Sequence, residues 1–287
     1  MNSLSFIGVG NMAGAIIRGI TAESSQTPYN ASAITLYDVL PEKTAQYASL
    51  GMNVAVSIPE AVLKSEAIIL SVKPQQYGDV LGEIRRSGID LSGKTFISLA
   101  AGIDTSTVEA ALGGNVGVVR TMPNTPLLIG EGMTALCRNG FVSDTVFDDV
   151  CRMFSARGRI VKLDEENMNR VIAVNSSSIA CFYRMIRALS PKESSPVSLG
   201  GLDEKAVRMI AAQAALGAAR MVLENENVPL DDLIRMVTSY KGTTEQMMLT
   251  MDHEDFDGMM ERAAIACTNR ADELGKALRD NINKANA

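Results

Sequence analysis

Residues 4–17 constrain the fold more than any other part of the sequence. The first four form a short apolar run, which is typical of a buried parallel strand. Residues 8–13 fit the pattern G-x-G-x-x-A, and an apolar helical segment follows them. A strand, a glycine-rich turn and a helix in this order are what dinucleotide binding requires. The alternative is a plain strand–turn–helix corner with no ligand.

The small residues of this turn each have a physical purpose in that interpretation. Gly8 permits the tight turn, and Gly10 has no Cβ, so a pyrophosphate can approach the backbone there. Ala13 is small enough for the helix to pack closely on the strand. The free N–H groups and the positive dipole end of the helix then face the phosphates. We expect five residues of the turn to bind the cofactor: Gly8, Val9, Gly10, Asn11 and Met12.

Strand-like and helix-like segments alternate over the first 160 or so residues. The expected strands are residues 4–7, 34–38, 52–56, 67–72, 95–99, 116–120, 132–136 and 159–162. This alternation predicts a Rossmann-type, doubly wound α/β sheet. From Asp164 onward no strand-like run occurs. We therefore expect a nucleotide-binding domain over 1–163 and an all-α domain over 164–287.

The second half is expected to be helical over 164–189, 203–225, 229–237, 243–251 and 256–285, with a possible break at Gly275. The segment 203–225 is rich in Ala and Met and is apolar on much of its circumference. A helix of that kind has to be buried on nearly all sides. We therefore expect this domain to bury it in a partner subunit, which predicts a homodimer.

Charge and composition exclude several classes of protein. The formal net charge of −6 argues against a nucleic-acid partner. No uninterrupted apolar run approaches 20 residues and no leader pattern opens the chain, so we expect a cytoplasmic protein without a membrane span. The four cysteines form no C-x-x-C pair, so neither a metal site nor a disulfide is expected. The single histidine, His253, is expected at a solvated helix end.

Polar and small residues follow several of the expected strands, where an open α/β sheet binds its ligands. Asp38 ends the second strand, and its carboxylate can accept hydrogen bonds from ribose hydroxyls or cap the next helix. Because a carboxylate repels a 2′-phosphate, Asp38 favours NADH over NADPH, although Lys43 nearby can offset this. The remaining cofactor candidates are Ser71, Val72, Lys73, Pro74, Ala101, Gly102 and Asn124. Lys73 is also a catalytic candidate, because it projects from a strand end into the crevice.

Four motifs in this order and spacing resemble the pyrroline-5-carboxylate reductase family. They are Gly-Val-Gly-Asn-Met-Ala at 8–13, Ser-Val-Lys-Pro at 71–74, Ala-Ala-Gly at 100–102 and Met-Pro-Asn-Thr-Pro at 122–126. The resemblance implies reduction of the cyclic imine 1-pyrroline-5-carboxylate to proline by NADPH or NADH, the last step of proline biosynthesis. It also implies that the helical domain forms an interlocked homodimer, which assembles further in some members.

The family's substrate motifs are only partly kept in the second domain. Where the family has S-G-S-G-P-A-Y, residues 175–181 read Asn-Ser-Ser-Ser-Ile-Ala-Cys, which keeps Ser177 and Ala180. Where the family has S-P-G-G-T-T, residues 239–244 read Ser-Tyr-Lys-Gly-Thr-Thr. The resemblance implies that backbone amides of this loop hold the substrate carboxylate and that Thr244 donates a hydrogen bond to the ring nitrogen. The substrate-binding candidates are Ser177, Lys241, Gly242, Thr243 and Thr244, with Thr244 catalytic.

Two changes in these motifs keep other functions open. The lost glycines add Cβ atoms where backbone would approach a ligand, which predicts a smaller or displaced pocket. If the backbone of Lys241 is left-handed, that conformation costs about 1–2 kcal/mol. The Lys241 ammonium could pair with a carboxylate and so replace a backbone contact. The alternatives are a diverged paralogue that reduces another small imine or a hydroxy or keto acid, and an NAD(P)-binding regulator without turnover.

Overall fold

The computed structural model describes residues 1–22, 29–190 and 198–285. The chain divides into two compact units. The first, called the nucleotide unit here, comprises Met1–Ser176 and Ala266–Ala287, and the second, the helical unit, comprises Ser177–Ile265. The last helix, α11 (Phe256–Ala285), contributes residues to both. The predicted boundary after residue 163 stays a prediction.

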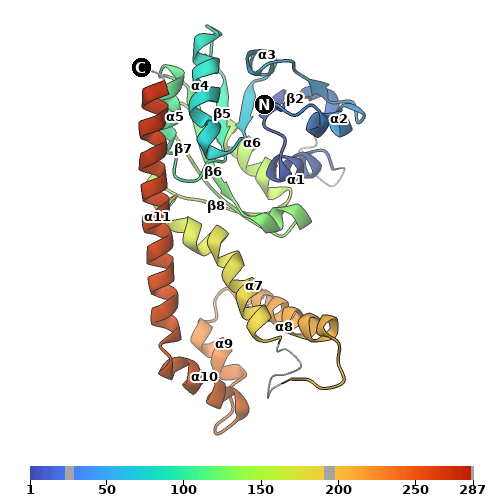
Figure 1. Cartoon of the computed structure of the whole chain (residues 1–287), viewed down its shortest axis with the longest axis vertical. Coiled ribbons are helices and arrows are strands. Elements are labelled where there is room, and N and C mark those ends of the chain that lie inside the picture. Colours follow the sequence, from blue (N-terminus) through green and yellow to red (C-terminus); the bar gives the residue numbers. More distant parts are fainter. Residues whose placement is uncertain (23–28, 191–197, 286–287) are drawn as a thin grey trace. The chain divides into compact units, whose positions relative to one another are not determined.

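The nucleotide unit is built on one eight-stranded sheet with the order β3-β2-β1-β4-β5-β6-β7-β8. Figure 1 labels β2 and β5 to β8 of this sheet. All eight expected strands are present, and their bounds are β1 Leu4–Ile7, β2 Ile34–Tyr37, β3 Asn53–Val54, β4 Ala67–Leu70, β5 Thr95–Ser98, β6 Gly117–Pro123, β7 Gly132–Arg138 and β8 Gly158–Lys162. The strands pair in parallel except for β6 and β7, which are antiparallel. The predicted doubly wound sheet is thereby confirmed.

Two apolar clusters cover the two faces of the sheet. Alternate residues of β1 point to opposite faces, so Leu4 and Phe6 pack in one cluster and Ile7 in the other. The helices of this unit are α1 Asn11–Ile20, α2 Glu42–Ala48, α3 Ile58–Leu63, α4 Tyr77–Arg86, α5 Thr105–Leu112 and α6 Asp144–Ser155. β1 and β4 lie side by side in the middle and are completely buried, as the apolar pattern predicts.

The end of β6 differs from the prediction. The strand runs on to Pro123, so Thr121, Met122 and Pro123 lie within it rather than after it. The extra residues pair with β7, for example Met122 with Ala135. Because β7 is antiparallel to β6, this part of the sheet departs from the simple alternation of parallel strands and crossover helices.

The prediction of one long helix over 164–189 is also wrong, because this segment forms three separate elements. The chain forms a 3₁₀ turn at Glu165–Asn167, then a π-helical segment at Ile172–Ser177, and only then α7 at Ser178–Ala188. Wider π-helical turns are rare and occur frequently at functional sites. This segment ends at the junction of the two units.

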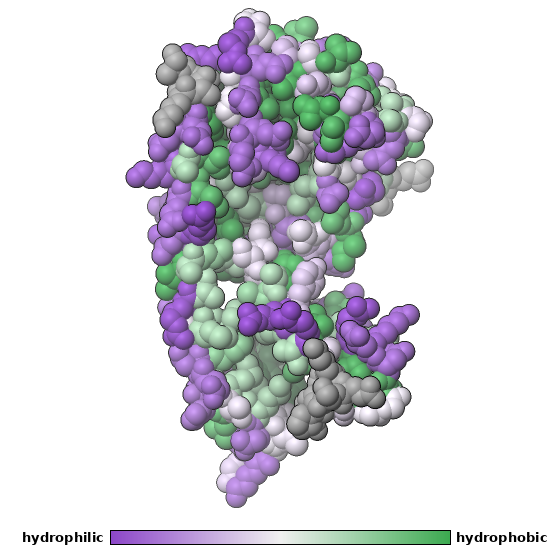
Figure 2. Space-filling view, in the orientation of Figure 1, coloured by the Kyte–Doolittle hydropathy of each residue, from purple (hydrophilic) through white to green (hydrophobic). Residues whose placement is uncertain are grey.

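The helical unit contains α7, α8 (Glu204–Glu224), α9 (Leu230–Met236), α10 (Thr243–His253) and the first residues of α11. All its described residues outside helices lie in turns or irregular segments, in agreement with the predicted all-α domain. Many large apolar side chains of α8 are exposed in the single chain, for example Met209 at 65% and Ile210 at 49%. Figure 2 shows apolar residues, in green, on the molecular surface. His253 ends α10 and is exposed, as expected.

By length and composition, α8 is the one helix among the described residues that could cross a membrane, with a mean hydropathy of 1.3 over its most apolar window. Arg208, Gln213 and Arg220 interrupt its apolar residues, so the helix contains no uninterrupted apolar run near 20 residues, and the expectation of no membrane span stays a prediction. A helix whose apolar face packs in a protein interface can have the same length and hydropathy as a membrane-spanning helix, so these two properties of α8 fit both.

Helix α11 continues through Gly275 without a break, in contrast to the possible interruption there. Gly275 is buried, and a Cβ added to it would lie 2.2 Å from the carbonyl oxygen of Gly102. Ile282, near the end of the helix, is buried in the cluster that contains α4 and α5. The glycine therefore lets the helix backbone approach the loop after β5.

Candidate active site

The turn between β1 and α1 has the geometry that the glycine pattern predicts. Gly8 has a φ of +91°, and a Cβ there would lie 2.9 Å from the backbone of Ser71. Gly10 has open space within 4 Å of where its Cβ would be. The hydroxyl of Ser71 donates to the Gly8 carbonyl oxygen at 2.6 Å and so fixes the turn against β4.

The start of α1 offers free backbone donors. Gly10 is its N-cap and no side chain caps the helix. The first helical hydrogen bond runs from Gly14 N–H to the Gly10 carbonyl oxygen, so the N–H groups of Asn11, Met12 and Ala13 have no acceptor in the helix. The N–H groups and the helix dipole together make an anion site.

Three helices of the nucleotide unit begin differently. In α3, α5 and α6 the N-cap side chains Ser57, Asp104 and Ser143 accept hydrogen bonds from N–H groups of the first turn. In α5, for example, the Asp104 carboxylate accepts a hydrogen bond from the Thr107 N–H. α1, like α2 and α4, has no side-chain cap, so the N–H groups of its first turn are available to a ligand.

Asp38 lies directly after β2 and contacts the glycine turn. Its Oδ2 atom accepts a hydrogen bond from the Val9 N–H at 2.7 Å, and its Oδ1 atom accepts one from the Leu40 N–H at 3.0 Å. The Lys43 ammonium is 3.7 Å from Oδ2. The N-cap of α2 is Pro41, so the alternative role of Asp38 as a cap of that helix is wrong.

Two cavities lie along the carboxyl ends of the strands. The larger cleft cavity, of about 320 Å³, extends between the ends of β2 and β4 and is lined by Gly8, Gly10, Asp38, Ser71, Val72 and Lys73 among others. The smaller cleft cavity, of about 200 Å³, is lined by Met12, Ser71, Val72, Leu99 and Pro123. Ser71 and Val72 line both cavities, so the two adjoin beside the glycine turn.

Lys73 and Pro74 follow β4 as the sequence predicts. Lys73 is exposed and precedes a 3₁₀ turn at Pro74–Gln76, where its N–H donates to Gln76. Its side chain lines the larger cleft cavity together with Asp38. The structure thus places Lys73 with the candidate cofactor-binding residues.

Ala101 and Gly102 follow β5, and Gly102 has a second reason to be small. Its φ of +79° lies in the left-handed region, and a Cβ on it would lie 2.9 Å from the Cα of Gly275 in α11. Ala101 is exposed. The packing of α11 therefore explains Gly102 in part, and the expected contact of both residues with a cofactor stays a prediction.

Asn124 is held by a partner that the sequence reasoning did not single out. Its amide nitrogen donates to the side chain of Asn175 at 3.0 Å, and its amide oxygen accepts from the Met133 N–H at 2.9 Å. Asn175 in turn donates to the carbonyl oxygens of Met122 at 2.8 Å and Met133 at 3.1 Å. Both asparagines are 7% exposed. Asn175 thus fixes the strand end that carries Pro123 of the smaller cleft cavity.

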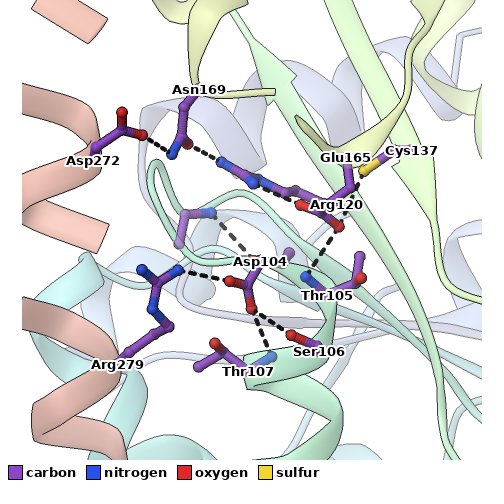
Figure 3. Close-up of polar contacts among 12 residues, drawn as sticks. Asp104, Thr105, Ser106, Thr107, Arg120, Cys137, Glu165, Asn169, Asp272 and Arg279 are labelled. Atoms are coloured by element: carbon purple, nitrogen blue, oxygen red, sulfur yellow. Dashed lines mark hydrogen bonds and ion pairs between the residues drawn. The ribbon is translucent and has the colours of Figure 1, made fainter. Parts of the chain in front are cut away.

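A second network, centred on the buried Arg120, holds residues 164–169 and α11 on the sheet (Figure 3). The Arg120 guanidinium, 2% exposed in β6, donates to Glu165 at 2.6 Å and to Asn169, which donates in turn to Asp272 of α11. The other oxygen of Glu165 accepts from the N–H of Thr105 at the start of α5. Sequence reasoning missed this role of Arg120, and a charged residue inside an apolar strand was the available signal.

Asp104 joins α11 to the same region. Its carboxylate accepts from the Thr107 N–H at 2.7 Å and pairs with Arg279 of α11 at 2.7 Å. Partial burial by itself would raise the pKa of Asp104, but hydrogen bonds from Thr107, Ser106 and Arg279 outweigh it and lower the pKa. The carboxylate is therefore the form that stabilises the fold.

The substrate candidates of the helical unit lie at the start of α10. Gly242 is the N-cap, again without a side-chain cap, and the first helical bond runs from Gln246 to Gly242. The N–H groups of Thr243 and Thr244 therefore have no acceptor in the helix. A Cβ on Gly242 would lie 2.2 Å from the Ser239 hydroxyl oxygen, so the turn requires glycine.

The backbone of Lys241 is left-handed, with a φ of +54°, which is the conformation that the sequence analysis considered at this position. Its N–H donates to the Glu245 carboxylate at 2.7 Å, and its ammonium lies 5.2 Å from the centre of the Tyr240 ring. The Thr244 hydroxyl makes no hydrogen bond with the described residues. The loop thus presents backbone donors and a hydroxyl.

Residues 175–177 show what the altered motif does to the backbone. Ser177 ends the π-helical segment and precedes α7. The Ser176 hydroxyl, where the family has glycine, is buried without a hydrogen-bond partner among the described residues. The change from glycine thus buries an unsatisfied hydroxyl at the junction between the units.

No disulfide joins the four cysteines, all of which lie in the described part of the chain. Cys137 and Cys151 are buried, while Cys181 and Cys267 are partly exposed. Burial and the nearby Glu165 carboxylate raise the pKa of Cys137 to about 12, which keeps it protonated. In the part of the chain that the structure describes, no group of three His, Cys, Asp or Glu side chains could hold a metal ion.

The fold and the site define a nicotinamide-dinucleotide-dependent oxidoreductase with a Rossmann-type domain and a helical domain. Residues 3–102 match the family model described as "NADP oxidoreductase coenzyme F420-dependent". Residues 165–274 match the model described as "Pyrroline-5-carboxylate reductase dimerisation". The chain belongs to the pyrroline-5-carboxylate reductase family.

Similar proteins support this assignment over nearly the full length. A pyrroline-5-carboxylate reductase from Haemophilus influenzae is 36% identical, with 94% of this chain and 97% of that protein covered. A solved pyrroline-5-carboxylate reductase from Coxiella burnetii has a TM-score of 0.83 and 30% identity, covering 95% of this chain and 98% of that one. A pyrroline carboxylate reductase from Plasmodium falciparum, solved with NADP bound, has a TM-score of 0.81 and 26% identity, covering 95% and 98%.

Proposed function

We propose that the protein reduces 1-pyrroline-5-carboxylate to proline with a nicotinamide cofactor. The observation that carries this proposal is a pair of helix starts. Both α1 and α10 begin at a glycine N-cap without a side-chain cap, and both therefore leave backbone N–H groups for an anion. One start carries the dinucleotide pattern, and the other carries the threonine pair of the substrate motif.

The residues of the nucleotide unit fit the cofactor. The N–H groups of Asn11 and Met12 bind the pyrophosphate, over the open space at Gly10. The Asp38 carboxylate, anchored by the Val9 and Leu40 N–H groups, accepts hydrogen bonds from the adenosine ribose. When bound, the reduced nicotinamide supplies the hydride. Asp38 favours NADH, and Lys73 contributes a positive charge beside the cofactor rather than a proton to the reaction.

The residues at the start of α10 bind the substrate. The N–H groups of Thr243 and Thr244 donate hydrogen bonds to the substrate carboxylate, and the Lys241 ammonium adds a positive charge. The Thr244 hydroxyl donates a hydrogen bond to the ring nitrogen and orients it, and the nitrogen takes a proton from solvent water as the hydride reaches the adjacent carbon. The chain has no covalent nucleophile in this scheme, so the rate arises from holding the two reactants in contact.

The assembly proposed is a homodimer or a larger assembly built from homodimers. Exposed apolar side chains of α8, such as Met209 and Ile210, supply the surface that a second copy buries. Substrate and cofactor are small molecules, and the protein works in the cytoplasm without nucleic acid or membrane.

The test is oxidation of NADH and of NADPH by the purified protein with 1-pyrroline-5-carboxylate. A panel of other cyclic imines and of hydroxy and keto acids is assayed in parallel. The proposal predicts that pyrroline-5-carboxylate gives the largest kcat/KM of the panel. A clear preference for another member would favour the diverged paralogue, and binding of cofactor without turnover of any member would favour the non-catalytic regulator.

A further inference from the structure

Arg157, in the turn between α6 and β8, has no role in the scheme above. It is half-buried and makes no ion pair with the residues that the structure describes. Its guanidinium donates instead to two main-chain carbonyl oxygens, that of Leu127 at 3.3 Å and that of Leu128 at 2.8 Å. Both carbonyls belong to the 3₁₀ turn at Thr125–Ile129, which follows β6. The cation therefore holds the C-terminal end of this turn, where carbonyl groups lack partners.

The main chain at Arg157 is itself fixed on the sheet. Its carbonyl oxygen accepts a hydrogen bond from the N–H of Gly132 at 3.0 Å, at the start of β7. The next residue, Gly158, pairs with Gly132 in the ladder between β7 and β8. A Cβ on Gly158 would lie 2.6 Å from the Gly132 carbonyl carbon, so the two backbones are in close contact. The Arg157 side chain thus extends to the 3₁₀ turn from a fixed position.

The aliphatic part of the same side chain packs on α1. A Cβ on Gly19, near the end of α1, would lie 2.7 Å from the Arg157 Cδ atom. Gly19 is buried inside the helix, where alanine is more favourable by about 0.5–1 kcal/mol. The arginine stem that lies against it explains the glycine. Arg157 therefore contacts α1 with its stem and the 3₁₀ turn with its guanidinium.

These two elements carry residues that line the smaller cleft cavity. Met12 lies in the first turn of α1, and Pro123 ends β6 just before the turn that Arg157 holds. The proposed function places the adenosine ribose at Asp38 in the larger cleft cavity, so the nicotinamide end of the cofactor extends toward the smaller one. A change in the separation of α1 and the turn therefore changes the space for the nicotinamide ring.

We propose that Arg157 is a positioning residue for the nicotinamide ring. It holds the turn at Thr125–Ile129 on α1 and so sets the separation of Met12 and Pro123. The inference rests on the proposed function for the direction in which the cofactor lies. Arg157 lines neither cleft cavity, so it acts through the turn and not by touching the cofactor. Without it, ordering of the turn opposes the binding of the ring.

Equilibrium binding of NADH and of ADP-ribose to the full-length protein tests the proposal, because ADP-ribose lacks only the nicotinamide. Arg157→Met keeps most of the aliphatic stem and removes the guanidinium. We expect it to weaken NADH about tenfold and ADP-ribose less than about twofold. Arg157→Lys keeps the charge and is expected to recover part of the NADH affinity. Arg86→Gln, which removes an exposed arginine at the end of α4, is the control and is expected to change neither.

Gly19→Ala provides an independent variant. Its added methyl group displaces the Arg157 stem, so we expect it also to weaken NADH more than ADP-ribose. In an Arg157→Ala background, which lacks the Cδ atom, the same change at Gly19 is expected to have little further effect, because both residues act through one contact. Thermal unfolding of each variant checks that it is folded.

The ratio of the two affinities separates positioning from general support of the fold. Equal weakening of NADH and ADP-ribose by Arg157→Met, or no weakening of either, overturns the proposal. A wild type that binds no nicotinamide dinucleotide overturns it as well. These measurements need no turnover. A protein that shows the selective loss of NADH affinity but does not reduce pyrroline-5-carboxylate contradicts the proposed reaction and leaves the role of Arg157 in place.

Discussion

Gly102 and Gly275 touch backbone to backbone, although 172 residues separate them in the chain. A Cβ on Gly275 would lie 2.2 Å from the Gly102 carbonyl oxygen, and one on Gly102 would lie 2.9 Å from the Gly275 Cα. The contact brings α11 against the loop that follows β5, at the edge of the sheet where ligands bind in this fold. Helix α11 is therefore part of the support of the nucleotide unit.

Gly275→Ala is expected to destabilise the protein by about 1–3 kcal/mol, because overpacking outweighs the gain in helix propensity. Lys276→Ala, one residue further along on the exposed side of α11, is the matched control and is expected to stay within about 0.5 kcal/mol. Urea unfolding of both variants measures the difference. Equal stability of the two would show that the close approach of α11 has no energetic consequence.

Asn175→Ala is expected to lower both stability and kcat/KM for the cofactor. It leaves the carbonyl oxygens of Met122 and Met133 and the Asn124 amide without their partner, each at a cost of about 1–3 kcal/mol. Asn175→Ser, which restores the family's residue, keeps one donor and is expected to recover part of the loss. If Asn175 only stabilises the fold, the cofactor KM of the folded variants will equal that of the wild type.

Asp104 is expected to make the free energy of unfolding depend on pH in the acidic range. Its pKa is lowered in the folded state, so its contribution is complete above its unfolded value of 3.8 and is lost as the pH falls through the lower folded value. Asp104→Asn should therefore reduce the free energy of unfolding at pH 7 more than at pH 3. Asp203→Asn is the control, because Asp203 caps α8 with the same geometry but has no ion pair among the described residues. If Asp104→Asn lowered the free energy of unfolding equally at pH 7 and pH 3, the assigned role of the Asp104 carboxylate would be contradicted.

Thr244→Ala is expected to lower kcat/KM for pyrroline-5-carboxylate by about 10²-fold or more, since the ring nitrogen loses its hydrogen-bond donor. The affinity for NADH should be unchanged, because Thr244 is assigned to substrate alone. Thr244→Ser keeps the hydroxyl and should recover most of the activity. Steady-state kinetics with a separate cofactor titration distinguish these effects, and an unaltered kcat/KM in the alanine variant would remove Thr244 from the reaction.

The sequence predicted the strands well, because buried parallel strands leave short apolar runs that need no knowledge of their neighbours. It did not predict that β6 extends to Pro123, since the pairing with β7 is antiparallel and depends on contacts outside the strand. The same limit applies to Asn175, whose amide completes hydrogen bonds of residues 42 and 53 positions away. The π-helical turn at Ile172–Ser177 likewise has no local pattern that distinguishes it from an α-helix.

The residues of the candidate site likewise differ in whether local sequence or a distant contact explains them. Gly8, Gly10 and Asp38 could be predicted because their roles follow from backbone conformation and from position after a strand. The second reason for Gly102 could not, because it comes from a helix near the far end of the chain.

The most direct test of the central claim follows the hydride itself. The protein is incubated with 1-pyrroline-5-carboxylate and NADH that carries deuterium at the transferable position, and the product is examined by mass spectrometry and NMR. The account predicts proline with one deuterium on the ring carbon that was doubly bonded to nitrogen. Bound cofactor without labelled proline, in a protein that is folded, would contradict it.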